Sequence, residues 1–261
     1  MTARVLLLGN PVSRSLSPVM QNAAFTALGI DCRYVLREVD AAELGGTIAE
    51  LRADDRILGA NVTIPHKQAV IPLLDELDPQ AARIGAVNTI SRQGARLKGS
   101  NTDVVGFQRA LNEQFPFPAR GGGQGGGFQR VAIIGAGGAA RAVAAVVQPT
   151  AEHVWVIARN LEQARRLCTD LGIERGGPVD MSRREETVAQ VDLVVNATPS
   201  DLPPTGWLRP GQHLFDLRSR RSVEGRAMLL HQGAASFEIW TGRQAPLDVM
   251  RAALDRESVP A

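Results

Sequence analysis

The chain has 261 residues, of which 44% are hydrophobic and 21% charged, a balance that supports a folded core and argues against wholesale disorder. Its net charge is only +2 and its basic residues are spread along the chain, so the sequence does not indicate nucleic-acid binding. Of 29 basic residues only Lys67 and Lys98 are lysines, and a position that stays lysine among so many arginines is a candidate for proton chemistry, because arginine does not lose its proton.

The first apolar run, Val5 to Leu8, has the length of a β-strand and is too short for a membrane span or a signal-peptide core. Cys32 and Cys168 lie far apart, with neither CxxC spacing nor neighbouring histidine ligands. We therefore expect reduced, buried thiols and no metal site. These features predict a cytoplasmic protein that does not bind membranes.

Strand-like runs alternate with helical patterns through the first hundred residues. Strands are expected at 5–8, 33–39 and 59–64, and helices are expected after Pro18 and near 43–52. This alternation is typical of βα units around a mainly parallel sheet. A chain of this length accommodates two domains of ordinary size.

Lys67 ends the segment Asn61-Val62-Thr63-Ile64-Pro65-His66-Lys67, which predicts a strand end that opens into a helix. Strand ends are where ligand-binding groups collect in α/β proteins. Composition alone does not distinguish a catalytic lysine from an ordinary surface lysine at this position. Lys98 lacks comparable polar surroundings, and we expect it at the surface.

Three further polar segments are framed by hydrophobic residues: Ser15-Leu16-Ser17-Pro18, Gly85-Ala86-Val87-Asn88-Thr89 and Asn101-Thr102-Asp103. Each has an ordinary structural explanation, since serine followed by proline begins helices, and Asn and Asp hold turns. Together with a nucleotide-binding domain, however, they predict a pocket for a polyhydroxylated substrate.

The glycine-rich tract at 119–128 has the composition of a linker and marks the approach to a second domain. The strand Val131 to Ile134 then runs into Gly135-Ala136-Gly137-Gly138-Ala139-Ala140-Arg141, followed by an alanine- and valine-rich helix. Strand, glycine turn and helix in this order are typical of a dinucleotide site, in which the helix N-terminus binds the pyrophosphate.

The next strand, 154–158, ends in Arg159, where an NAD-selective site would usually place an acidic residue for the ribose 2′-hydroxyl. An arginine can instead pair with a 2′-phosphate, which favours NADP. A later strand, 191–195, ends in Asn196-Ala197-Thr198, whose polar groups should lie beside the cofactor. A further strand is expected at 213–217.

These motifs in this order resemble the shikimate dehydrogenase family. The resemblance rests on Gly9-Asn10-Pro11, the Ser15, Lys67, Asn88 and Asp103 segments, the Gly135 turn, Asn196-Ala197-Thr198, and Met228-Leu229-Leu230-His231-Gln232-Gly233-Ala234. It implies the NADP-dependent, reversible reduction of 3-dehydroshikimate to shikimate in aromatic amino-acid biosynthesis.

The resemblance also implies a role for each group of residues. Lys67 and Asp103 would be the catalytic pair; Ser15 and Ser17 would bind the substrate carboxylate; Thr63, Asn88 and Gln232 would hold its ring hydroxyls. The cofactor would be held by Gly135, Ala136, Gly137, Gly138, Ala139, Arg141, Arg159, Asn196, Ala197 and Thr198.

The expected architecture is an α/β protein of two domains, with a mainly parallel sheet in the first and a Rossmann-like NADP-binding fold in the second. We expect the substrate domain at 1–103, the NADP-binding domain at 104–227, and C-terminal helices at 228–261 that return to the first domain.

The chain departs from the family pattern between Asp216 and Met228, where family members usually have a tyrosine-containing loop, a helix and another strand. Tyr34 is the only tyrosine here, and Ala227 replaces a glycine common in the family. The lost crossover helix predicts either a homodimer partner that covers the exposed surface or a smaller sheet.

Two alternatives stay open at this point. A paralogue acting on quinate or on an aminated shikimate would need only a few altered contacts. A redox-inactive ligand-binding homologue could keep the substrate pocket, although the retained Lys67 and Asp103 argue against it.

Overall fold

The computed structural model describes residues 2–116 and 127–257; of the predicted linker, residues 119–126 lie outside this part. The chain forms two compact units, residues 1–106 with 229–261, and residues 107–228. It leaves the first unit within helix α4 (Asp103–Gln114) and returns within helix α8 (Val223–Thr241).

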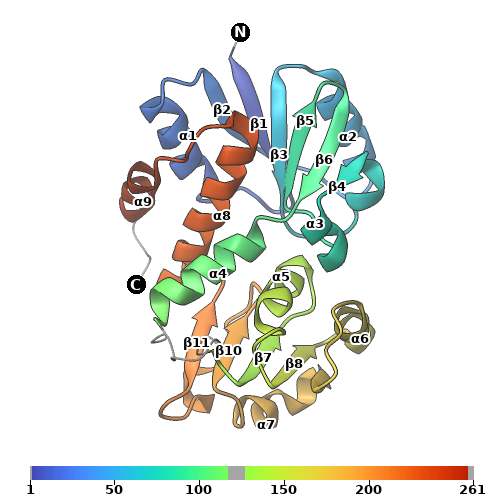
Figure 1. Cartoon of the computed structure of the whole chain (residues 1–261), viewed down its shortest axis with the longest axis vertical. Helices are drawn as coiled ribbons and strands as arrows, with labels where there is room; N and C mark the ends of the chain where they lie inside the picture. The colour runs from blue at the N-terminus through green and yellow to red at the C-terminus, as the bar shows by residue number, and fades with distance from the viewer. Residues whose placement is uncertain (1, 117–126, 258–261) are drawn as a thin grey trace. The chain divides into compact units, whose positions relative to one another are not determined.

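The first unit is built on a sheet whose described strands have the order β2-β1-β3-β5-β6-β4 (Figure 1). The central strand β1 is parallel to β2 and β3, and β5 is antiparallel to both β3 and β6. The strands are β1 (Ala3–Gly9), β2 (Cys32–Glu38), β3 (Ile57–Val62), β4 (Glu76–Leu77), β5 (Thr89–Gln93) and β6 (Arg96–Ser100).

Both faces of this sheet are covered. Val5 and Leu7 of β1 pack into one core with α1 (Ser17–Ala27) and α8, whereas Leu6 and Leu8 pack into another with α2 (Leu44–Ala53). Alternate residues of a strand point to opposite faces, so a continuous apolar run is what a strand buried on both sides requires. The other helical segments of this unit are η1 (Ile71–Leu73), α3 (Pro79–Ile84) and α9 (Leu247–Asp255).

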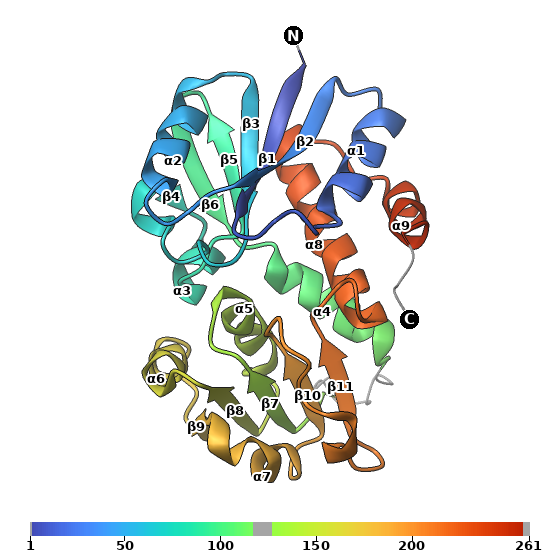
Figure 2. The same cartoon turned by 180° about the vertical axis from the view of Figure 1, so that it is seen from behind.

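The second unit contains an all-parallel sheet in the order β11-β10-β7-β8-β9 among its described residues (Figure 2). The chain moves from β7 through a helix to β8 on one side, and reaches β10 on the other, so β7 ends at a topological switch point. Its elements are β7 (Arg130–Ile134), α5 (Gly138–Val147), β8 (His153–Ala158), α6 (Leu161–Asp170), β9 (Gly176–Asp180), η2 (Met181–Arg183), α7 (Arg184–Val188), β10 (Leu193–Asn196), η3 (Thr205–Trp207) and β11 (His213–Asp216).

The predicted α/β class with mainly parallel sheets is confirmed. The antiparallel hairpin of β5 and β6 was not predicted. Its turn contains Gly94 in the left-handed region at φ 63°. Gln93 and Arg96, the paired residues that flank this turn, are polar and exposed. Such short strands lack the long apolar run by which the parallel strands were recognised.

The shortened stretch after β11 leads directly into α8. Ser222 caps that helix: its Oγ donates to Asp216 O at 2.5 Å and accepts from Gly225 N at 2.9 Å. A Cβ at Gly225 would lie 2.7 Å from Asp216 O, so glycine permits this close packing. The sheet of this unit has five strands among the described residues.

Candidate active site

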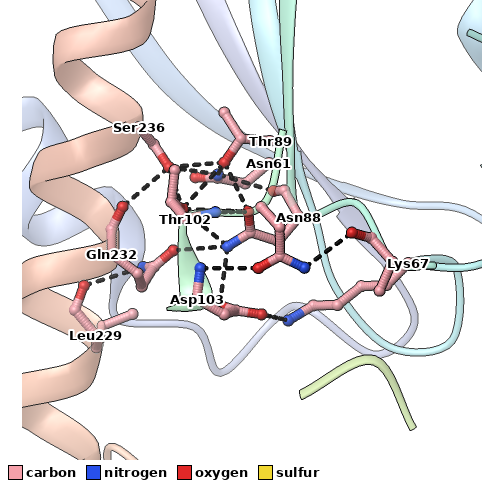
Figure 3. Close-up of polar contacts among 11 residues, drawn as sticks. Asn61, Lys67, Asn88, Thr89, Thr102, Asp103, Leu229, Gln232 and Ser236 are labelled. Atoms are coloured by element: carbon pink, nitrogen blue, oxygen red, sulfur yellow. Dashed lines mark hydrogen bonds and ion pairs between the residues drawn. The ribbon is translucent and has the colours of Figure 1, made fainter. Parts of the chain in front are cut away.

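Lys67 and Asp103 meet in the first unit as an ion pair that is largely withdrawn from solvent. Lys67 Nζ donates to Asp103 Oδ2 at 2.5 Å, and the two side chains are only 13% and 6% exposed (Figure 3). Lys67 follows β3, and Asp103 is the first residue of α4. The other lysine, Lys98, pairs with Glu76 at the same distance, but those side chains are 32% and 47% exposed. Burial therefore distinguishes the two lysines.

Local structure brings the segment around Asn88 beside Lys67. Asp78 caps α3 by accepting from Ala81 N at 2.6 Å, and the helix ends at Gly85 in the left-handed conformation, φ 67°. This is the helix stop that glycine provides at least cost. The chain then turns so that Val87 N donates to Lys67 O at 2.7 Å. The glycine thus directs the following residues towards the lysine.

Asn88 holds the second oxygen of the carboxylate. Its Nδ2 donates to Asp103 Oδ1 at 2.8 Å and to Thr102 Oγ1 at 2.9 Å, and its Oδ1 accepts from Thr102 N at 2.7 Å. Asp103 is thus bound at one oxygen by a cation and at the other by an amide. The carboxylate is oriented before any substrate binds, which is the arrangement that efficient proton transfer requires.

Gln232 reaches this group from α8. Its Oε1 lies 3.4 Å from Asn88 Nδ2, and its own Nε2 donates to Leu229 O at 3.0 Å. The two helices come close at Gly106 of α4, where a Cβ would lie 2.6 Å from Gln232 Cβ. Glycine at this position allows Gln232 to lie beside Asn88.

Sequence reasoning gave no role to four buried polar residues behind this group. Ser236 Oγ lies 2.8 Å from Thr89 Oγ1 and 3.0 Å from Thr102 Oγ1, and Asn61 Nδ2 donates to Ser236 Oγ at 3.1 Å (Figure 3). Ser236 and Thr89 are fully buried. The available signal was the polar residue in an otherwise apolar helix or strand face, since a buried polar group needs partners.

Ser15 and Ser17 form a hydroxyl pair at the start of α1. Ser15 Oγ donates to Ser17 Oγ at 3.2 Å and accepts from Ser17 N at 3.2 Å. Thr63 lies just beyond β3 and is half-buried. Gly9 packs against it so closely that a Cβ would lie 2.3 Å from Thr63 Cγ2, which gives the Gly9-Asn10-Pro11 motif a packing reason.

All seven residues predicted to act on the substrate therefore belong to the first unit. Four of them form one connected group: Asn88 binds Asp103 and Gln232, and Asp103 binds Lys67.

In the second unit the glycine turn follows β7, as predicted. Gly135 has φ 116°, and a Cβ there would lie 3.1 Å from Ala197 O and 3.2 Å from Thr198 Cγ2. Gly137 precedes α5, and a Cβ there would meet no protein atom within 4 Å. The first glycine is thus required by the fold, and the second leaves open space at a helix N-terminus, the position where a pyrophosphate binds in dinucleotide-binding folds.

Two further residues that the sequence predicts to bind the cofactor, Asn196 and Arg141, are buried in this unit. Asn196 is fully buried and folds its own loop, because its Oδ1 accepts from Thr198 N at 3.1 Å and its Nδ2 donates to Ser200 O at 2.9 Å. Arg141 is also buried, and its Nη2 donates to Asp170 Oδ2 at 2.6 Å, which connects α5 to the end of α6. The Arg141 side chain therefore has a structural partner within this unit.

Arg159 is exposed directly after β8. The neighbouring Asn160 caps α6 by accepting from Gln163 N at 3.1 Å, and Gly135 N donates to Ile157 O at 2.8 Å. The glycine turn and the end of β8 are thereby connected. This places an exposed guanidinium next to the strand end where the adenosine ribose binds in such folds.

Among residues 2–116 and 127–257, no three His, Cys, Asp or Glu side chains are grouped so that they could hold a metal ion. Within the same ranges, no helix has both the length and the apolar character needed to cross a membrane. Cys32 and Cys168 are free and buried, and burial raises the pKa of each thiol to about 11.

Three family models match the chain. The shikimate dehydrogenase substrate binding domain matches residues 7–90, shikimate / quinate 5-dehydrogenase matches 125–205, and the shikimate 5′-dehydrogenase C-terminal domain matches 225–254. The matched segments lie in both units.

Individual proteins are similar over nearly the whole chain. An NADP(+) shikimate dehydrogenase from Moorella thermoacetica is 43% identical, covering 100% of this chain and 95% of the relative. A Thermus thermophilus shikimate 5-dehydrogenase, solved with NADP(H) and shikimate, has a TM-score of 0.79 at 31% identity over 98% of this chain and 99% of that one. A Corynebacterium glutamicum quinate dehydrogenase, solved with NAD, has a TM-score of 0.81 at 27% identity over 98% and 99%.

Proposed function

Because the chain belongs to the shikimate dehydrogenase family, we propose that it catalyses the NADP-dependent, reversible reduction of 3-dehydroshikimate to shikimate. The observation that carries the proposal is the Lys67–Asp103 pair, buried and held on its far side by Asn88. Reduction of a ketone requires a proton to reach the oxygen as a hydride reaches the carbon, and this pair can hold such a proton. NADPH, when bound, supplies the hydride.

In the direction of reduction, the Lys67 ammonium donates a hydrogen bond to the carbonyl oxygen of the substrate. This bond stabilises the negative charge that develops on the oxygen, and the proton moves from the Lys67–Asp103 pair to that oxygen. In the opposite direction the alcohol proton passes to the pair. The hydrogen bond from Asn88 to Asp103 Oδ1, 2.8 Å long, keeps the carboxylate facing the lysine in both directions.

The substrate is proposed to bind the first unit through both ends. Ser15 and Ser17 hold its carboxylate, because two hydroxyls 3.2 Å apart at the beginning of a helix suit a small anion. Thr63, Asn88 and Gln232 hold its ring hydroxyls. The buried hydroxyl groups behind Asn88 keep that amide in one orientation, so the binding geometry is set before the substrate arrives.

The cofactor is proposed to bind the second unit at the turn after β7. The open space at Gly137 accommodates the pyrophosphate and the exposed Arg159 pairs with the 2′-phosphate. Ala136, Gly138 and Ala139 complete the turn, and the loop formed by Asn196, Ala197 and Thr198 borders it. Arg141 is proposed to act here by holding α5 against α6 through Asp170.

A spectrophotometric assay of purified protein tests the function. Shikimate and quinate are each offered with NADP and with NAD, and the reduced cofactor is followed at its absorbance maximum. We expect turnover of shikimate with NADP, at a kcat/KM at least tenfold above that for quinate or for NAD. A preference for NAD would contradict the role given to Arg159.

Two outcomes would replace the proposal by one of its alternatives. A higher kcat/KM with quinate would make the chain a quinate dehydrogenase. The Corynebacterium glutamicum quinate dehydrogenase has a similar fold. Shikimate binding in calorimetry without turnover by any pair of substrates would identify a redox-inactive ligand-binding homologue.

The proposed enzyme works in the cytoplasm, where the buried, free Cys32 and Cys168 stay reduced.

A homodimer is the second alternative for the surface left by the shortened stretch. Light scattering on the eluting protein distinguishes the two: a mass near 27.9 kDa means that the smaller sheet is sufficient, and twice that mass means that a partner contributes.

A further inference from the structure

Tyr34, the only tyrosine of the chain, is buried in the first unit and is bound at three points. Its hydroxyl donates to Asn61 Oδ1 at 2.7 Å. Its backbone N donates to Asn22 Oδ1 at 2.8 Å, and its backbone O accepts from Asn22 Nδ2 at 3.3 Å. Asn22 belongs to α1, the helix that begins at Ser17. The tyrosine therefore connects this helix to the strand that carries Asn61.

The orientation of the Asn61 amide follows from its surroundings. Its Nδ2 donates to the backbone carbonyl of Asn88 at 3.0 Å, and a carbonyl can only accept. The other end of the amide must then be the oxygen, and the group that donates to it is the Tyr34 hydroxyl. Without that hydroxyl, a buried carbonyl oxygen would lose its hydrogen bond, and the amide would lose what holds its second end.

From Asn61 the hydrogen bonds continue in one direction to the catalytic pair. Asn61 Nδ2 donates to Thr89 Oγ1 at 3.1 Å, and Thr89 Oγ1 donates to Asn88 Oδ1 at 2.9 Å. Asn88 Nδ2 then donates to Asp103 Oδ1 at 2.8 Å (Figure 3). Each group in this series is buried, so solvent offers no substitute for a missing member.

The same residue is connected to the helix that begins at the serine pair. Asn22, which binds the Tyr34 backbone at both its N and its O, lies on α1, whose first residue is Ser17. Burial raises the pKa of the Tyr34 hydroxyl, which therefore stays a donor to Asn61. The helix that begins at the residues proposed for the carboxylate is thus joined through Tyr34 to the residues proposed for the ring hydroxyls.

We propose that Tyr34 is a positioning residue for the substrate: through Asn61 it orients Asn88, and through Asn22 it holds α1, the helix that begins at the serine pair, against the strand that carries Asn61. This inference rests on the proposed function, since it concerns how that substrate is held. Tyr34 is only 3% exposed and is proposed to act through these neighbours.

The test is Tyr34→Phe, which removes only the hydroxyl, with shikimate oxidation as the measurement. We expect the KM for shikimate to rise about tenfold, the loss of one buried hydrogen bond, with a smaller fall in kcat and an unchanged KM for NADP. A purely structural role would lower the amount of active enzyme, and with it the apparent kcat, without moving the KM for shikimate.

Trp240→Phe is the matched control from the same core. The Trp240 ring lies 6.1 Å from that of Tyr34, and its Nε1 donates to the backbone oxygen of Ile90 at 2.9 Å. The substitution removes one part-buried hydrogen bond outside the series that leads to Asp103, so the KM for shikimate should stay within twofold of wild type. If both variants raise this KM equally, the effect comes from loosened packing and the inference fails.

A second measurement leaves the sequence unchanged. Because Tyr34 is the only tyrosine, 3-fluorotyrosine introduced during expression gives a single fluorine resonance that reports this position alone. We expect saturating shikimate to shift that resonance and NADP alone to leave it in place. An unmoved resonance at saturating shikimate would overturn the inference even if Tyr34→Phe failed to fold.

The inference and the proposed function fail in different ways. Wild-type protein that neither binds nor oxidises shikimate would overturn the proposed function and the inference together. Wild-type protein that oxidises shikimate, with Tyr34→Phe equal to it in the KM for shikimate, would overturn the inference alone.

Discussion

The proposed substrate and cofactor sites are built from different materials. In the first unit, buried side chains bind one another, and Asp103, Asn88 and Asn61 each have several partners. In the second unit, the turn at Gly135 is shaped by backbone conformation and close packing, and Arg159 reaches out from it exposed. The comparison teaches that the proposed substrate site depends on a network of buried side chains, whereas the proposed cofactor site depends on a glycine turn and one exposed arginine.

The largest effect is expected from removing Lys67. Lys67→Met should lower kcat for shikimate oxidation by about 10²- to 10⁴-fold, the usual contribution of a general acid or base. Lys98→Met is the matched control, because Lys98 is also paired with a carboxylate at 2.5 Å but is more exposed. That variant should keep kcat within twofold. Equal losses of kcat in the two variants would mean that the buried ion pair contributes no more to catalysis than the more exposed one.

The substitutions Gly135→Ala and Gly137→Ala should affect stability and NADP binding differently. At Gly135 the positive φ and the contact with Ala197 O strain a side chain, so Gly135→Ala should cost about 1–3 kcal/mol of unfolding free energy and weaken NADP binding. At Gly137 the added methyl meets no protein atom, so stability should be retained while NADP binding falls. Chemical denaturation and calorimetry measure the two quantities. Unchanged NADP affinity in Gly137→Ala would contradict the proposal that the pyrophosphate binds at this position.

Arg159 should affect the choice of cofactor and little else. Arg159→Ala should raise the KM for NADP about tenfold, because a charge-assisted contact with the 2′-phosphate is lost, and leave the KM for NAD unchanged. Arg166→Ala, a change on the exposed face of α6, serves as the control. A rise in both KM values would show that Arg159 supports the fold of the site and does not recognise the phosphate.

The smallest effect concerns stability at alkaline pH. The pKa of Tyr34 is raised in the folded protein, so unfolding releases a proton above pH 10, and stability should fall by about 1.4 kcal/mol per pH unit from this residue alone. Tyr34→Phe lacks this dependence, so denaturation curves of the two proteins should converge between pH 10 and 11. Cys32 and Cys168, whose pKa is raised to about 11, contribute equally to both proteins. Parallel curves would mean that Tyr34 ionises freely when folded.

Local patterns were enough to predict the α/β class and the βα order, and to identify Lys67 and the Gly135 turn as candidates. A glycine turn between a strand and a helix is a local feature, and so is a polar group at the end of an apolar run. The shortened stretch after Asp216 was also visible in the sequence, but the close packing of Gly225 against Asp216, which lets this stretch lead directly into α8, was not.

What only the tertiary structure decided is which polar groups meet. Ser236 lies 175 residues from Asn61 and 147 from Thr89, and Tyr34 lies 27 from Asn61, yet these side chains share hydrogen bonds. No periodicity or spacing contains such pairings, because they depend on how α1 and α8 pack against the sheet. The sequence by itself determined the chemical groups and the order of the elements that carry them. Packing decided that Lys67 would be buried against Asp103 and that Lys98 would be exposed, since the burial of a side chain is a property of all its neighbours.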